Sequence, residues 1–551
     1  MTSTVRRSIL ERLIRAGLQV TPDALGYLLS ADSPLELADS IIQSMDSASS
    51  PVVLTREYVQ SCIDRTAPEV IDDQAPLVLM SGPDSGPSAA ADAAAPPAPD
   101  TDSVHSIQVL KNPAASMVGS AGTVDDFLAL FTDRFRRIKR MYMGRVDTHD
   151  AVSIEVLKQK KISPRRRRKP DDVGEFSEPV PSYTVIGMVR DKRVSRQGNV
   201  TIDFEDFEGS ITCVIPGSRE GPDGRKLLES GNSILLDEVI CVSGRLDQPG
   251  RMIADRVTFP DVPIPRDIGR AKRDVYAVFI SDLHCGSYHF LEDEFDRFIS
   301  WISGHDLDST ERSMVDQIEY LFIAGDLCDG VGVYPGQQDD LRIPDIAEQY
   351  AYVARKLRNV PEHVKIVCIP GNHDACRQAL PRPPIPNEFA KPLYDLGERL
   401  LMMGDPCHLR VEGVNILITH GDSLDDLTTQ LPGVTYEKPD LAMKALLQKR
   451  HLAPVYGGKT ELAPLTRDWM VVDTPPDIVH FGHAHHNVCD NYRQVQIINS
   501  GCFQRQTEFM KKQGIKPTPG IVTLLNLRTF SPEIKLFYSF EDQSAGDTRI
   551  S

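Results

Sequence analysis

The chain has 551 residues, of which 41% are hydrophobic and 25% are charged, as is usual for a globular protein that dissolves in water. No apolar run reaches the roughly 20 residues of a membrane-spanning helix, and the first residues lack the apolar core of a secretory signal. The 10 cysteines include no CxxC pair, which favours reduced thiols in a cytoplasmic protein over a disulfide or zinc framework. The net charge of -17 excludes non-specific binding of nucleic acid by the whole surface, so any such contact should be local.

The first third of the chain predicts three segments. Apolar residues at helical spacing, with Thr21-Pro22 as a helix start, indicate a small helical domain over residues 1–75. Residues 76–120 contain a run rich in Pro, Ala, Ser and Asp and predict a disordered linker. Residues 121–180 predict an amphipathic helix from Asp125 to about Met141 and then a basic run over 158–169. That run is either a solvated linker or a contact to a phosphate backbone.

Residues 181–265 change to short strands in which apolar and polar residues alternate. Five such strands separated by turns predict a small antiparallel barrel of the OB-like type, although an SH3-like barrel would give a similar pattern. The expected strands cover residues 185–189, 200–204, 211–215, 239–242 and 253–259.

Residues 270–545 alternate apolar strands with helical or irregular stretches, which predicts an α/β domain. Polar residues follow five of these strands, and functional side chains usually lie at such strand ends. The five polar segments are Ser281-Asp282-Leu283-His284, Gly325-Asp326-Leu327-Cys328-Asp329, Gly371-Asn372-His373-Asp374, Thr419-His420-Gly421-Asp422 and Gly482-His483-Ala484-His485.

These segments predict a site for two divalent metal ions. Asp282 and His284 flank one residue, so both side chains can face the same side. Carboxylates and neutral imidazoles suit Mn²⁺, Fe²⁺ or Zn²⁺, and Asp326 is placed to bridge two ions. The remaining expected ligands are Asn372, His420, His483 and His485. Such a site hydrolyses phosphate esters, and His373 is placed to stabilise the transition state or protonate the leaving oxygen.

The five segments together resemble the calcineurin-like metallophosphoesterase superfamily, whose pattern is D-x-H, G-D-x-x-D, G-N-H-[DE], H and G-H-x-H. The resemblance covers roughly residues 272–540 and implies a sandwich of two sheets flanked by helices. It also implies how the ligands divide. One metal would take Asp282, His284, Asp326 and His485, and the other would take Asp326, Asn372, His420 and His483, with His373 as the catalytic histidine.

A barrel directly before such a domain resembles the small, B-type subunits of replicative DNA polymerases. With every ligand position filled, the layout is similar to the small-subunit family of archaeal family D DNA polymerases. That resemblance implies a 3'–5' exonuclease that proofreads single-stranded or mismatched DNA ends with Mn²⁺, or else Mg²⁺, Fe²⁺ or Zn²⁺. It also implies a heterodimer with a large polymerising subunit. The barrel should bind that subunit rather than DNA, because its acidic stretch would repel phosphate; the stretch comprises Asp203, Glu205, Asp206 and Glu208.

Three alternatives stay open. The chain could be a repair nuclease of the same superfamily, a stand-alone metallophosphatase, or a noncatalytic scaffold that retains the site. Among further residues, Asp422 and His486 are candidates for orienting ligands. Arg377 and Arg382 either contact a phosphate or lie in a solvated loop.

Overall fold

The computed structural model describes residues 106–160, 181–219, 221–305 and 307–538, together with short stretches and single residues between 9 and 59. The chain divides into two compact units, Met1–Pro99 and Asp100–Ser551. Residues 161–180, which hold most of the predicted basic run, lie outside the described residues.

In the first unit, helix α2 (Pro22–Leu29) begins where the sequence predicts a helix start. The Thr21 hydroxyl accepts a hydrogen bond from the Ala24 amide at 3.3 Å, as a residue that caps a helix does. Strands β1 (Gln19–Val20) and β2 (Val53–Leu54) pair in parallel, which the sequence did not predict. Most residues of the other predicted helices lie outside the described part of the chain.

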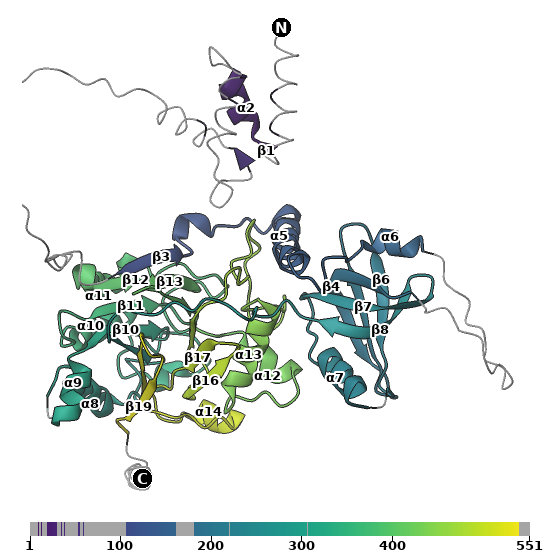
Figure 1. The fold of residues 1–551 in the computed structure, drawn as a ribbon. Coiled ribbons are helices and arrows are strands. Elements are labelled where there is room, and N and C mark those ends of the chain that lie inside the picture. The colour runs from purple at the N-terminus through teal and green to yellow at the C-terminus, as the bar shows by residue number, and fades with distance from the viewer. Residues whose placement is uncertain are drawn as a thin grey trace, which may run out of the picture. The chain divides into compact units, whose positions relative to one another are not determined.

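The second unit contains two six-stranded sheets (Figure 1). The strands of the first sheet, in spatial order, are β12 (Leu400–Met402), β11 (Lys365–Ile369), β10 (Ile318–Ala324), β9 (Tyr276–Ile280), β18 (Ile521–Asn526) and β19 (Pro532–Leu536). Those of the second sheet are β16 (Val488–Tyr492), β17 (Val495–Asn499), β15 (Ile478–Phe481), β14 (Val414–Ile418), β13 (Cys407–Val411) and β3 (Ile107–Lys111).

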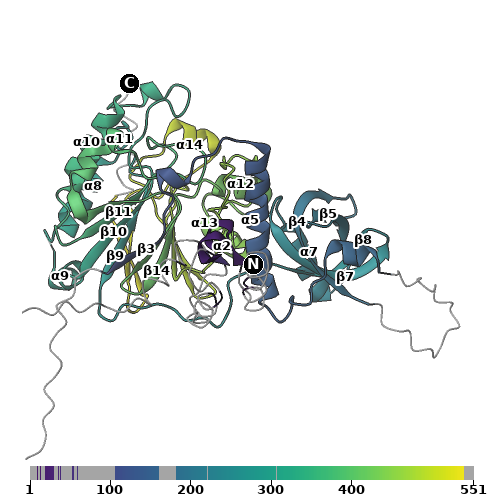
Figure 2. The same cartoon turned by 90° about the horizontal axis from the view of Figure 1, so that it is seen from above.

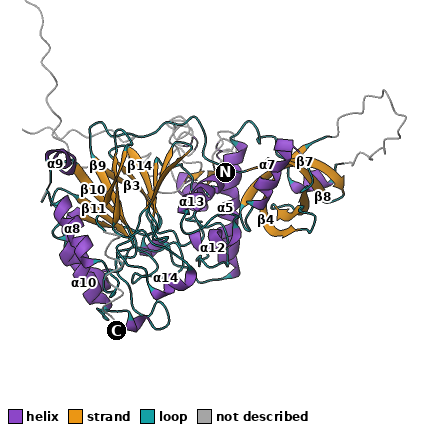
Figure 3. Ribbon diagram, turned by 90° about the horizontal axis from the view of Figure 1, so that it is seen from below, coloured by secondary structure: helices purple, strands orange, loops and turns teal. Residues whose placement is uncertain are grey.

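The two sheets pack face to face, with helices on their outer faces (Figure 3). One apolar core lies between the sheets and joins Phe279 and Phe322 to Leu409 and Ile416. A second core packs the first sheet against α8 (Glu292–Ile302), α10 (Ile346–Leu357) and α11 (Asn387–Tyr394). A third packs the second sheet against α12 (Leu424–Gln430) and α13 (Pro439–Lys449). The predicted sandwich of two sheets flanked by helices is confirmed.

Strand β3 corrects the predicted linker. The sequence predicted disorder over residues 76–120, but β3 pairs antiparallel with β13. It is the edge strand of its sheet and leaves Val109 and Leu110 exposed. Its sequence therefore lacks the alternation of apolar and polar residues that predicts a half-buried strand. Its order comes from hydrogen bonds to a strand that lies about 300 residues further along the chain.

The predicted five-stranded barrel is present and closed. Its strands are β4 (Tyr183–Val194), β5 (Val200–Glu205), β6 (Ser210–Ile215), β7 (Val239–Gln248) and β8 (Arg251–Thr258), in the spatial order β4-β5-β6-β8-β7. Two features differ from the prediction. Strands β6 and β8 pair in parallel, and helix α7 (Gly221–Asn232) follows β6. That the barrel is of the OB type stays an interpretation.

Helix α5 (Val124–Met143) connects the barrel to the sandwich (Figure 2). Thr123 and Asp126 form a capping box at its start, and its apolar side packs against barrel strands and Val471. The buried Arg134 of α5 forms an ion pair with Asp468 at 2.6 Å. The two parts of the second unit therefore share a packed interface.

The other short elements lie between the larger ones. They are α6 (Ile154–Lys158), α9 (Ser309–Val315), α14 (Glu508–Gln513) and 3-10 turns at Ala115–Met117, Gln337–Asp339 and Gly397–Arg399. Within the described ranges, no helix is both long enough and apolar enough to cross a membrane.

Candidate metal centre

The polar segments predicted to follow strands lie at one edge of the sandwich. Strands β9, β10 and β11 are parallel neighbours in one sheet, and β14 and β15 are parallel neighbours in the other. Parallel neighbours end at the same edge of a sheet, so the segments after all five strands meet. The structure brings together all seven residues that the sequence proposed as metal ligands, Asp282, His284, Asp326, Asn372, His420, His483 and His485.

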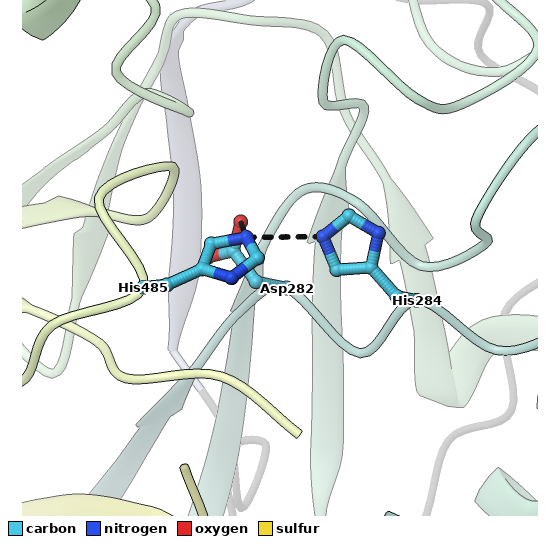
Figure 4. Close-up of side chains that lie close together, drawn as sticks. All are labelled: Asp282, His284 and His485. Carbon is cyan, nitrogen blue, oxygen red and sulfur yellow. Dashed lines mark hydrogen bonds and ion pairs between the residues drawn. The ribbon is translucent and has the colours of Figure 1, made fainter. Parts of the chain in front are cut away.

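One half of the centre contains Asp282, His284 and His485 (Figure 4). The Nε2 atoms of His284 and His485 face each other at 3.1 Å. His485 Nε2 also lies 3.3 Å from Asp282 Oδ1, and His284 Nε2 lies 3.5 Å from Asp326 Oδ2. Asp326 thereby connects this half to the next.

The other half contains Asp326, Asn372, His420 and His483. His420 Nε2 lies 3.4 Å from Asp326 Oδ2 and 2.9 Å from Asn372 Oδ1. His483 Nδ1 lies 3.1 Å from the same Asn372 oxygen. The same Asp326 oxygen, Oδ2, lies near imidazole nitrogens of both halves, which is the position a bridging ligand needs.

The Nδ1 contacts of His420 and His284 show which ring nitrogen is left to bind a metal ion. His420 Nδ1 lies 2.8 Å from the carbonyl oxygen of Ala324, and His284 Nδ1 lies 3.1 Å from Asp329 Oδ1. Both partners are acceptors, so each Nδ1 carries a proton, and Nε2 is the nitrogen left to bind a metal ion or a second proton. The Nε2 atoms of both rings lie near carboxylate or amide oxygens. Positive charge between these groups stabilises the cluster, and this donor set fits divalent metal ions.

The pKa values of the centre reflect its excess of acceptors. Burial opposes the charge on His420, but the carboxylates of Asp326, Asp282 and Asp422 together outweigh burial and raise the pKa of His420 to about 10. Burial likewise opposes the charge on Asp326, yet His420 and His373 hold its pKa well below the usual value. The carboxylates of the centre thus favour the binding of positive charge.

The backbone is strained where the ligands are attached. Asp282, His284, Asp326, His483 and His485 all have φ between 51° and 64°, the left-handed region that residues with side chains rarely adopt. Such strain concentrates at functional sites. Gly371 allows the close approach, because a Cβ there would lie 2.1 Å from Asp326 Oδ1.

His373 lies beside the centre. Its Nδ1 is 2.7 Å from the Asp329 carbonyl oxygen, and its ring meets that of His284 edge to face at 4.7 Å. It lines a cavity of about 370 Å³ together with the ligands His284, Asp326, Asn372, His483 and His485. The ring therefore borders both the metal ligands and the space where a substrate would bind.

Two acidic residues that contact the ligands, Asp329 and Asp425, had no predicted role. Asp329 contacts His284 and accepts from Gln504 at 3.0 Å. Asp425 Oδ1 lies 3.1 Å from His483 Nε2. Asp329 could have been found, since it ends the G-D-x-x-D segment, whereas Asp425 belongs to no such pattern.

The four residues proposed for support or substrate contact differ in position. Arg382 is fully buried and forms ion pairs with Asp422 at 2.6 Å and with Asp405 at 3.3 Å. Arg377 donates to backbone carbonyls of its own loop, including that of Ala379 at 2.9 Å. His486 is half-buried, and its Nδ1 lies 3.4 Å from the Lys516 carbonyl. Asp405 was not singled out from the sequence, yet it also accepts from the Thr419 hydroxyl at 2.6 Å, beside His420.

Comparisons with known proteins identify relatives of this chain. Residues 277–489 match the family of DNA polymerase alpha/epsilon B subunits. The DNA polymerase II small subunit of Methanocaldococcus jannaschii is 39% identical over 410 residues, which cover 74% of this chain and 64% of the relative. That of Archaeoglobus fulgidus is 38% identical over 403 residues, covering 73% and 75%. That of Methanothermobacter thermautotrophicus is 38% identical over 408 residues, covering 74% and 78%. A solved archaeal phosphodiesterase, 14% identical, aligns with 47% of this chain and 99% of its own at a TM-score of 0.25.

Proposed function

The chain belongs to the family of archaeal DNA polymerase II small subunits, and we propose that it is the 3'–5' exodeoxyribonuclease of a two-subunit replicative polymerase. Its substrate is the 3'-terminal phosphodiester of single-stranded or mismatched DNA. Polymerisation belongs to a large subunit, with which this chain forms the holoenzyme.

The observation that carries the proposal is the acceptor cluster around Asp326. Asp282, His284, Asp326 and His485 would hold one divalent ion, and Asp326, Asn372, His420 and His483 the other. When bound, two such ions supply a nucleophile at neutral pH and neutralise charge on the phosphate. Mn²⁺ is the first choice, and Mg²⁺, Fe²⁺ and Zn²⁺ are the other candidates.

His373 would move the proton. The carbonyl of Asp329 fixes the proton of the neutral ring on Nδ1, which leaves Nε2 as the atom that exchanges a proton with the substrate. Once Nε2 has taken up a proton from water, a ring that is oriented in this way and lines the cavity can deliver that proton to the departing 3' oxygen. We therefore assign His373 as the catalytic histidine and not as a ligand.

The barrel supports a contact to the large subunit rather than to DNA. Of its acidic stretch, Asp206 accepts from the Ile154 amide at 2.9 Å, and Asp203 pairs with Arg193. Two residues of the stretch thus make contacts within the chain, and the acidic character of the stretch as a whole disfavours a phosphate backbone.

The test uses a primer whose 3' end is mismatched, with Mn²⁺ and with or without excess chelator. The full-length chain, isolated and in complex with the large subunit, should remove the mismatched nucleotide. Asp326→Ala should abolish removal, while His305→Ala, an exposed histidine outside the centre, should behave like the wild type. Activity in excess chelator, or full activity of Asp326→Ala, would contradict the two-metal assignment.

The alternatives have distinct outcomes in the same assay. A chain that dephosphorylates a generic phosphomonoester faster than it shortens DNA, and that forms no complex with a large subunit, would be a stand-alone phosphatase. DNA cleavage without such a complex would indicate a repair nuclease. A complex that extends matched primers but never removes a mismatch would indicate a noncatalytic scaffold.

A further inference from the structure

Two aromatic rings form a wall beside the metal centre. The rings of Tyr334 and Phe509 lie nearly parallel, with centroids 6.4 Å apart and planes 24° apart. Tyr334 also meets the His373 ring at 6.4 Å, at an angle of 62°. Both aromatic residues line the cavity onto which His373 opens. A substrate held at His373 would therefore lie next to the two rings.

The wall is held by the same residues that hold the centre. The Tyr334 hydroxyl donates to Asp340 at 2.9 Å. The amide of Val333 donates to the Gln337 side chain at 2.8 Å, and Gln337 in turn donates to the Asp329 carbonyl at 2.7 Å. Because Asp329 also contacts His284, the loop that carries Tyr334 is tied to the metal ligands.

Phe509 is placed by the short helix α14. Thr507 accepts from the Met510 amide at 3.2 Å and so fixes the first turn of the helix. Phe509 nevertheless stays 58% exposed, and Val333, which lines the same cavity from the loop that carries Tyr334, is 36% exposed. Exposed apolar side chains gathered at the mouth of a cavity mark a binding surface.

We propose that Tyr334 and Phe509 stack on the nucleobase at the 3' end of the DNA strand. This inference rests on the proposed exonuclease function and adds a base-binding subsite to it. Every nucleobase has a π face, so stacking on aromatic rings binds any base and needs no sequence-specific hydrogen bond. Lys459 lines the same cavity and supplies a positive charge for the phosphate.

The subsite would also explain a preference for mismatched ends. A paired terminal base is stacked inside the duplex and hydrogen-bonded to its partner, so its release costs free energy. A mismatched or single-stranded base is already free to reach the two rings. The aromatic wall would thus select frayed ends without reading the base.

The test compares two oligonucleotides that differ in one group. One ends in a normal 3' nucleotide, and the other ends in a nucleotide whose base is replaced by hydrogen. The wild-type full-length chain, alone and in its complex, should cleave the normal end about tenfold or more faster in kcat/KM, within the range expected for one stacked base. Phe509→Ala and Tyr334→Ala should lose this preference by slowing cleavage of the normal end and leaving the baseless end unchanged.

Conservative and distant variants separate stacking from folding. Phe509→Trp and Tyr334→Phe keep a ring and should restore the preference, and Phe389→Ala, a part-exposed phenylalanine of α11, should leave it intact. A wild-type chain without the preference, or alanine variants that slow both substrates equally, would overturn the proposal. If the wild type cleaves neither substrate, the exonuclease function fails. The affinity of the chain for each oligonucleotide, measured by fluorescence anisotropy, then tests the base subsite separately. Equal affinities would overturn the subsite as well. Weaker binding of the baseless oligonucleotide by the wild type, with no such difference for Phe509→Ala, would support it.

Discussion

His284 and His485 present their Nε2 atoms to each other at 3.1 Å, although 201 positions separate them in the chain. Asp329 holds the proton of His284 on the opposite nitrogen, so one of the two facing atoms carries a lone pair. A cation bound between these imidazoles and the carboxylates of Asp282 and Asp326 would stabilise the arrangement. Metal binding can therefore be tested through the stability of the fold, without an activity assay.

Divalent metal should stabilise the fold, and the effect should require Asp326. Because the metal would bind the native state and not the unfolded chain, Mn²⁺ at about 100 times its Kd should add about 2.7 kcal/mol to the free energy of unfolding. Thermal unfolding with Mn²⁺ and with chelator measures this shift. Asp326→Asn should unfold at the same temperature in both conditions, and a persistent shift in that variant would refute the bridging role.

His373→Ala should keep its metal and lose its rate. Removal of a general acid usually slows a reaction about 10²- to 10⁴-fold, while the proposed ligands are untouched. Elemental analysis and single-turnover cleavage measure the two properties, with His363→Ala as a control at an exposed histidine. Loss of metal together with activity would make His373 a ligand. In the complex, His373→Ala should still extend matched primers at close to the normal rate.

Arg382 should be essential to stability. It is buried between Asp405 and Asp422, so Arg382→Met would leave the buried Asp405 and the part-buried Asp422 without this partner. Breaking a buried pair from one side costs roughly 3–5 kcal/mol. Urea unfolding gives the value, and Arg528→Met, which breaks a half-exposed pair with Asp274, should cost less than about 1 kcal/mol. Similar costs for the two variants would contradict the role assigned to Arg382.

His408 should make the fold sensitive to mild acid. Burial, together with the charges of Lys111 and Arg410 and against that of Asp473, lowers the pKa of His408 from 6.5 to about 4. The unfolded chain therefore binds a proton at a higher pH than the native one, and stability is complete above pH 6.5 and declines as the pH falls towards 4. The decline from this residue should be at most roughly 3 kcal/mol.

Urea unfolding at several pH values between 4 and 7 checks the His408 prediction. His408→Leu should reduce the slope in that window but not remove it, because burial also lowers the pKa of His451 and His480. His305→Leu, at an exposed position, should leave the slope unchanged. A variant with the wild-type slope would show that other groups carry the pH dependence.

The first 99 residues should be dispensable for the complex with the large subunit. They form a compact unit apart from the rest of the chain, whereas the barrel and sandwich offer a large preformed surface. Co-expression and size-exclusion chromatography of a chain beginning at residue 100 should yield the complex. A chain beginning at residue 121 is the informative comparison, because it lacks β3 and uncovers the edge of β13. The chain that begins at residue 121 should be less stable than the chain that begins at residue 100. If the chain that begins at residue 100 fails to form the complex, the contact lies in the first unit.

The sequence by itself determined the strands of the sandwich, the barrel and the set of candidate ligands. Buried strands are apolar throughout and end in polar residues, so their order along the chain already showed which side chains would share an edge. Asp282, Asp326 and His420 could be chosen because each follows such a strand directly or within two residues.

Only the tertiary structure decided which supports surround those ligands. Strand β3 owes its order to pairing with β13, and Asp425 owes its place beside His483 to the packing of α12. Tyr334 and Phe509 come from loops and a short helix 175 residues apart, with no shared pattern. Hydrogen bonds and ring contacts between distant segments depend on how the sheets pack. The local periodicity of the sequence does not predict that packing.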